Sequence, residues 1–136
     1  MDDRIKYISG FKYQLKEDYT IITDIIGYDI KTDYIELNIK GILLIKKGYA
    51  WDGPSGPTID TKTFMRGSLV HDALYQLMRL SLIPESYRKY SDWLLQLICI
   101  QDGMSELRAF YVYKAVRWFG AGNASSKNKK QIKVAP

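Results

Sequence analysis

A short loop rich in glycine and proline, residues 51–57 (WDGPSGP), separates two parts of the chain whose hydrophobic patterns differ. Each of its two prolines fixes its own φ angle and restrains the residue before it, so the loop holds a set shape. The residues before the loop alternate between apolar and polar side chains, which is typical of strands. The residues after it repeat with the period of an amphipathic helix.

The first fifty residues predict a small antiparallel sheet. Residues 34–39 alternate strictly, which places Ile35, Leu37 and Ile39 on one face of a strand. The connections are short enough for antiparallel hairpins. The other expected strands are residues 11–15, 19–26, 42–45 and 49–51.

The second part of the chain predicts three packed helices, at about residues 63–80, 85–101 and 105–119. The first has its apolar stripe at Val70, Leu74, Leu77 and Met78. The predicted fold class is therefore α+β: a small N-terminal antiparallel sheet followed by three packed helices. We expect a single domain over residues 1–122 and a basic C-terminal tail over residues 123–136.

The charge of the chain is concentrated at its end. The net charge is +5, and residues 121–136 carry four lysines and no acid. The remaining residues are nearly neutral, which argues against a broad nucleic-acid-binding face. The lysines could contact an anionic partner, although such a run is more commonly a solvated terminus.

The single cysteine, Cys99, lies in an apolar run, and we expect a buried, inert thiol as in a reducing compartment. The N-terminus is charged and lacks the apolar core of a secretory signal. No apolar stretch reaches the roughly 18 residues of a membrane span, so none is expected.

The only histidine, His71, is the centre of the candidate site. It precedes Asp72, and on a helix it shares a face with Tyr75, four residues later. His71 lies at the flank of the apolar stripe, so we expect at least half of it to be buried, with hydrogen-bond partners. Asp92 interrupts the apolar second helix, and a contact with Arg66 or His71 would satisfy its carboxylate.

Two interpretations of these residues remain open. In the first they converge on one pocket, where His71 is the acid/base group and Asp52 and Asp72 assist it. The carboxylates could also hold a hard divalent cation such as Mg²⁺, although no metal is firmly implied. In the second interpretation the same residues form a buried network that braces the fold. The expected substrate-binding residues of the first are Ser55, Arg66, Tyr75 and Asp92, with Arg66 holding an anionic group.

Several specific chemistries are excluded by residue count and spacing. One histidine and one cysteine are too few for a structural zinc site or for the several histidines of a metal phosphohydrolase with a His-Asp pair. Cys99 would be stranded in the core as a nucleophile. No glycine-rich phosphate loop is present, and Ser55 lacks the spacing of a nucleophile elbow.

The chain carries a set of motifs at residues 49–57 (YAWDGPSGP), Arg66, residues 71–75 (HDALY), Asp92, Gly103 and residues 113–120 (YKAVRWFG). Together they resemble the family called domain of unknown function 1353 (DUF1353). The family consists of small proteins of phages, prophages and bacteria. The resemblance covers about residues 40–122; the loop departs from the family's more usual Thr-Asp-Gly-Ala-Ser pattern but keeps Asp52 and Ser55.

The resemblance implies a phage or prophage origin and no agreed activity. We therefore expect a phage-type accessory protein with an Asp/His/Arg pocket, such as a small hydrolase, in the host cytoplasm or the virion. The alternative is a virion or assembly component, or a host-directed inhibitor, in which these residues are a brace. Its partner would be a phage or host protein, contacted through residues 121–136.

Overall fold

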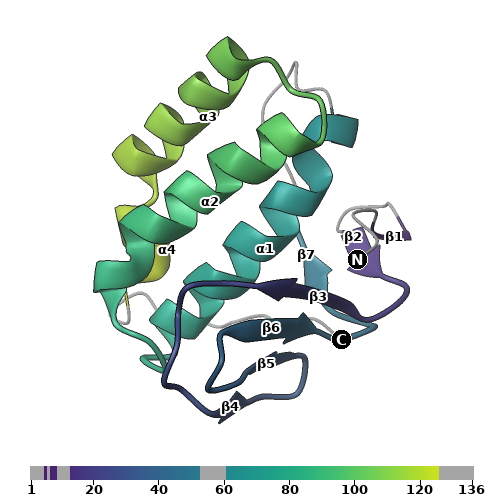
Figure 1. The fold of residues 1–136 in the computed structure, drawn as a ribbon, viewed down its shortest axis with the longest axis vertical. Coiled ribbons are helices and arrows are strands. Elements are labelled where there is room, and N and C mark those ends of the chain that lie inside the picture. The colour runs from purple at the N-terminus through teal and green to yellow at the C-terminus, as the bar shows by residue number, and fades with distance from the viewer. Residues whose placement is uncertain (1–4, 6, 9–12, 53–60, 126–136) are drawn as a thin grey trace. The chain divides into compact units, whose positions relative to one another are not determined.

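The computed structural model describes residues 5, 7–8, 13–52 and 61–125 (Figure 1). These residues form two compact units, one built from the strands that end by Asp52 and one from the helices that begin at Thr61. The order of strands first and helices second confirms the predicted α+β class. Most of the predicted basic tail lies outside the described residues, and the domain boundary at residue 122 stays a prediction.

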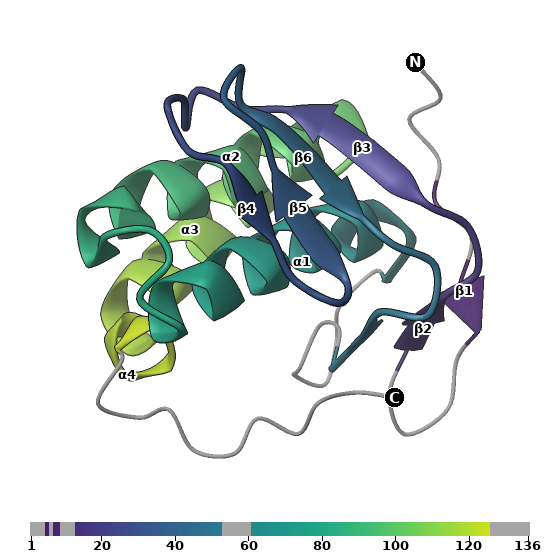
Figure 2. The same cartoon turned by 90° about the horizontal axis from the view of Figure 1, so that it is seen from below.

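The N-terminal unit contains two antiparallel sheets where the sequence predicted one. The smaller sheet has the order β1-β2-β7, made of β1 (Tyr7–Ile8), β2 (Tyr13–Leu15) and β7 (Ala50–Trp51). The larger has the order β3-β6-β5-β4, made of β3 (Tyr19–Ile22), β6 (Ile42–Ile45), β5 (Ile35–Leu37) and β4 (Ile30–Lys31). Figure 2 shows the strands of the larger sheet side by side.

The alternation of apolar residues sets the buried face of the larger sheet. Ile35 lies opposite Ile45, and Leu37 lies opposite Leu43, so all four side chains point to the same face. All four are buried. A register slip by one residue would expose them, so this pairing fixes the strand register.

Ile39 was predicted to lie on the same strand face as Ile35 and Leu37, and this is wrong: it lies beyond the strand and is 63% exposed. The strand ends at Leu37 because Asn38 begins a turn, in which its side-chain Oδ1 accepts two backbone N–H groups at 3.0 Å. Gly41 completes the turn with a φ of +87°, a conformation that favours glycine. A Cβ there would lie 2.3 Å from the carbonyl oxygen of Thr23.

The helical unit follows the predicted order with small changes at the ends. The second predicted helix begins as one 3-10 turn, and a short extra helix follows the third. Ser105 caps the third helix, accepting the backbone N–H of Arg108 at 3.2 Å. The elements are α1 (Thr61–Arg79), η1 (Glu85–Tyr87), α2 (Arg88–Gln101), α3 (Glu106–Phe119) and α4 (Ala121–Ala124).

Helix α2 packs between α1 and α3 (Figure 1). The predicted stripe of α1 is fully buried, which confirms the assignment of its apolar face. Gly67 allows α1 to approach α2 closely, because a Cβ there would lie 2.8 Å from Cδ1 of Leu95. Cys99 is buried in this interface, and burial raises the pKa of its thiol to about 12, as expected for an inert cysteine. Among the described residues, no helix combines the length and apolar character needed to cross a bilayer.

The turn at Gly41 yields a test of the sheet. Gly27 and Gly41 both have positive φ angles, but only Gly41 faces a backbone atom, and Gly27 has open space around it. We expect Gly27→Ala to cost about 1 kcal/mol through the left-handed backbone alone. Gly41→Ala should cost about 2–4 kcal/mol, because a clash adds to the strain. Thermal unfolding followed by circular dichroism measures both, and equal costs would contradict this account of the turn.

Candidate functional site

A buried carboxylate on α2 connects three helices. Asp92 has no exposed surface, and both of its oxygens accept hydrogen bonds. Oδ1 lies 2.7 Å from Nε2 of His71 and accepts the hydroxyl of Tyr75 at 2.5 Å, both from α1. Oδ2 accepts Nη1 of Arg117, on α3, at 2.9 Å. We call Asp92, His71, Tyr75 and Arg117 the Asp92 cluster.

The spacing of α1 brings two of these donors together. His71 and Tyr75 are four residues apart, and their ring centroids are 4.1 Å apart with the planes tilted by 34°. This is the shared face that the sequence predicted, and the contact of His71 with Asp92 is one of the two proposed to satisfy the buried acid. Arg117 comes from the last turn of α3, where a cation is also favoured by the helix dipole.

His71 is held by one nitrogen. Its side chain is 14% exposed, which agrees with the predicted burial, and Nε2 faces the carboxylate. With Asp92 ionised, Nε2 must carry the proton and donate it to Oδ1. None of the described residues hydrogen-bonds the other ring nitrogen, Nδ1. The imidazole is therefore oriented by a buried acid through Nε2, and among the described residues its Nδ1 has no hydrogen-bond partner.

The ionisation of the cluster follows from its contacts. Burial works against the charged form of Asp92, but hydrogen bonds from His71, Tyr75 and Arg117 outweigh it and hold the pKa below its ordinary value of 3.8. Burial and the neighbouring carboxylate raise the pKa of Tyr75 far above its ordinary value. Tyr75 is thus a permanent donor, and Asp92 is a carboxylate at neutral pH.

A second arginine extends the cluster at the start of α2. Arg88 donates from Nη2 to the backbone carbonyl of Arg117 at 2.6 Å, which ties the last turn of α3 to α2. Within the part of the chain that the structure describes, its buried Nε has no hydrogen-bond partner. Neither arginine was among the predicted site residues, although Arg117 lies in the motif at residues 113–120 and could have been found there.

Gly120, directly after α3, is a third residue that the site prediction missed. A Cβ there would lie 2.7 Å from the hydroxyl oxygen of Tyr75 and 2.5 Å from the carbonyl oxygen of Val116. Only a residue without a side chain lets the chain pass this close to Tyr75. Gly120 therefore preserves the space in which the tyrosine reaches Asp92.

Arg66 was expected beside His71 or Asp92, and the structure pairs it elsewhere. Its guanidinium binds the carboxylate of Asp102 through Nε at 3.1 Å and Nη2 at 2.9 Å. Nη2 also donates to Oε1 of Gln101 at 3.0 Å. Arg66 lies five residues before His71 on α1, which turns it about 140° away from the His71 face. It therefore pairs with the C-terminal end of α2 and not with Asp92.

The remaining predicted site residues are Asp52, Ser55 and Asp72, and the structure tests only the position of Asp72 on α1. Asp52 is exposed after β7 in the N-terminal unit, and the two units are not placed relative to one another, so its contact with His71 stays a prediction. Ser55 lies outside the described residues. Asp72 is partly buried on α1, turned about 100° from His71 around the helix axis.

The described residues contain no group of three or more histidine, cysteine or acidic side chains that could hold a metal ion. Mg²⁺ therefore stays an expectation. A surface hollow of about 270 Å³ lies after α1, lined by Met78 and residues 81–85, none of which belongs to the Asp92 cluster.

Comparisons with known proteins return no match among family models, curated proteins or solved structures. The resemblance to DUF1353 stays an expectation.

The depressed pKa of Asp92 predicts acid-dependent stability. A native-state pKa below the ordinary 3.8 means that the stabilising effect is complete above that pH and lost as pH falls through the lower value. Asp92→Asn lacks this contribution and should be about 3–5 kcal/mol less stable at neutral pH. The gap between the two proteins should narrow below about pH 4 in urea unfolding. Asp29→Asn, an exposed control, should follow the wild type, and a gap independent of pH would contradict the assignment.

The close approach at Gly120 predicts a coupled effect with Tyr75. Gly120→Ala should lower stability by about 1–3 kcal/mol, because its Cβ displaces the hydroxyl that Asp92 accepts. In a Tyr75→Phe background the same change should cost less, since the displaced oxygen is gone. A double-mutant cycle by thermal unfolding gives the coupling, and identical costs in both backgrounds would show that Gly120 does not serve Tyr75.

Proposed function

We propose that this chain is an interaction protein of the phage-accessory kind that its motifs imply. In this proposal the Asp92 cluster braces the helical unit, and α3 supplies the contact surface. The observation that carries it is the complete burial of Asp92 with both oxygens engaged by donors from two other helices. Each oxygen of this enclosed acid already accepts a hydrogen bond from a neighbouring helix.

The energetics of the cluster support a brace. Removing one partner of a buried ion pair commonly costs about 3–5 kcal/mol, because the remaining charge is left uncompensated. Asp92 joins α1 and α3 to α2 through directional hydrogen bonds, which specify one arrangement of the helices more narrowly than apolar packing does. Arg88 adds a fourth tie at the end of α3.

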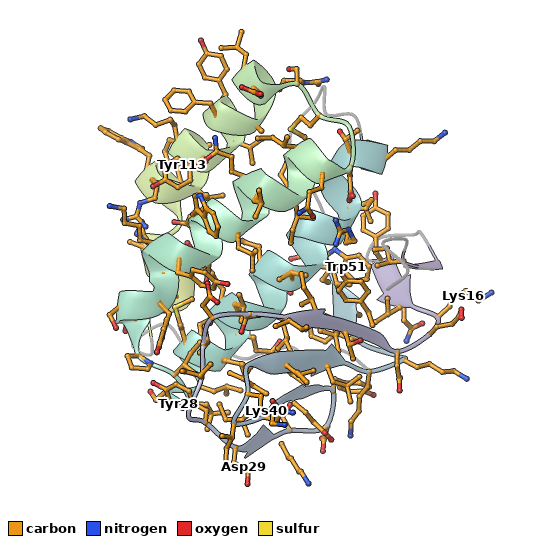
Figure 3. All side chains as sticks on the ribbon, viewed as in Figure 1. Lys16, Tyr28, Asp29, Lys40, Trp51 and Tyr113 are labelled. Atoms are coloured by element: carbon orange, nitrogen blue, oxygen red, sulfur yellow. The ribbon has the colours of Figure 1, made fainter. Side chains whose placement is uncertain are left out.

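The helix that this brace holds has an unusual surface. Large apolar side chains of α3 are between 45% and 80% exposed; they are Leu107, Phe110, Tyr111, Trp118 and Phe119. Aromatic side chains project from α3 on the side away from α2 (Figure 3). Apolar patches exposed on a protein surface mark contact sites more than they serve the fold. A rigid helix with such a face is suited to binding a partner.

A small hydrolase is the second candidate, supported by the orientation of His71. A carboxylate on Nε2 and an uncommitted Nδ1 on a 14% exposed ring is the arrangement of a general base oriented by an acid. In that case Nδ1 would take the proton from an attacking water, and Asp92 would stabilise the imidazolium. The proposal ranks second because the described hollow after α1, lined by Met78 and residues 81–85, does not include this ring.

The variant His71→Gln separates the two candidates. A brace predicts a loss of about 1–3 kcal/mol in unfolding free energy, because Asp92 loses a donor. It also predicts that wild type and variant hydrolyse p-nitrophenyl acetate and p-nitrophenyl phosphate equally, at the rate of Lys89→Gln, an exposed control on α2. A folded His71→Gln protein with about 100-fold less hydrolysis than wild type would favour the hydrolase.

A further inference from the structure

We infer that α3 docks on the surface of a bilayer that contains anionic lipids. This names the partner class of the proposed contact surface, and it rests on the proposed function. The surface consists of Leu107, Phe110, Tyr111, Lys114 and Trp118, which we call the α3 outer face.

The α3 outer face is continuous along the helix. At 100° per residue, its members fall within an arc of about 100°. The opposite side of α3 is turned inward, where Ala109 is fully buried and Val112 and Val116 pack against the core. Phe119, also largely exposed, lies about 80° beyond this arc at the last residue of the helix. The helix thus has one side committed to the fold and one large apolar side open to a partner.

The residue types of this face fit a lipid–water interface. Tryptophan and tyrosine favour that boundary, because each combines an apolar ring with a polar group. Trp118 is the most exposed large apolar residue of the described chain, at 80%. Lys114 extends its ammonium to 5.8 Å from the centre of the Phe110 ring, so its stem can lie along apolar surface while the charge reaches lipid headgroups.

The charge around the face is positive, which selects anionic lipids. Helix α3 carries Arg108, Lys114 and Arg117 against a single acid, Glu106. An apolar helix face bordered by basic residues lies in the plane of the lipid–water interface. Burial of its apolar side chains and attraction of its charges to anionic lipids both hold it there. No described helix is suited to span the bilayer, so the contact is peripheral.

Two other occupants fit less well. In a two-fold dimer, identical positive faces would meet each other. At 1.5 Å per residue, the face from Leu107 to Trp118 is only about 17 Å long and about 10 Å wide, well short of the roughly 800 Å² that each partner of a stable dimer buries. A nucleic acid would need several cationic side chains to contact its phosphates, whereas the α3 outer face has one, Lys114, beside four apolar side chains.

The experiment is co-sedimentation of the full chain with lipid vesicles. Vesicles with about one-quarter phosphatidylserine in phosphatidylcholine should bind it at least about tenfold more tightly than pure phosphatidylcholine. Trp118→Ala with Phe119→Ala should weaken binding about tenfold. Trp93→Ala is the matched control, because it removes an exposed tryptophan of α2 outside the face. About 1 M salt should release the protein, since it screens the charges.

Three results would overturn the lipid assignment. They are equal binding to neutral and anionic vesicles, no binding to either, and a dimer in light scattering that the Trp118→Ala, Phe119→Ala variant dissociates. In the first two cases, a loss of stability in the Asp92→Asn protein would still support the bracing role of Asp92, so only the assignment of lipid as the partner would fail. An Asp92→Asn protein as stable as wild type overturns the proposed function itself, whatever the vesicles show.

Discussion

The helical unit depends on one ionised acid in a place without water. Asp92 would be strongly unfavourable there alone, and its burial is stable only because α1 and α3 both supply donors. The requirement is mutual: the three helices must adopt one rotation and one register for His71, Tyr75 and Arg117 to reach the same carboxylate. Apolar packing along α1 and α2 provides most of the cohesion, and the acid determines which packing is reached.

The same interaction explains the neighbouring details of the unit. Arg117 must stay in place to donate to Oδ2 of Asp92, and Arg88 holds it there by donating to the backbone carbonyl of Arg117. Tyr75 must reach Oδ1, and Gly120 leaves the room for it. These contacts are concentrated at the C-terminal end of α3, so the end with the most exposed aromatic residues is also the most firmly held. A rigid helix loses little conformational freedom on binding, which favours a contact role.

The sequence predicted what depends on local periodicity. The buried pair Ile35 and Leu37 follows from alternation, and the joint approach of His71 and Tyr75 follows from helical spacing. The prediction for Ile39 failed because a side-chain hydrogen bond of Asn38 ends the strand early, and the alternation of apolar residues does not reveal such a turn. Which arginine pairs with Asp92 was harder still to predict from the sequence. Whether Arg66 or Arg117 reaches Asp92 depends on the register of one helix against another, which no single-helix pattern contains.

The brace also sets the charge that α3 presents. Arg117 is 32% exposed, yet its charge is compensated by Asp92, so it contributes less to the outer surface than its sequence position implies. The positive character of the helix then comes mainly from Arg108 and Lys114, and Lys114 lies within the apolar face itself. Lys114 lies over the ring of Phe110 one turn earlier, so its charge is held within the aromatic patch. This charge favours an anionic partner with an apolar layer beneath its charged groups, which a bilayer provides.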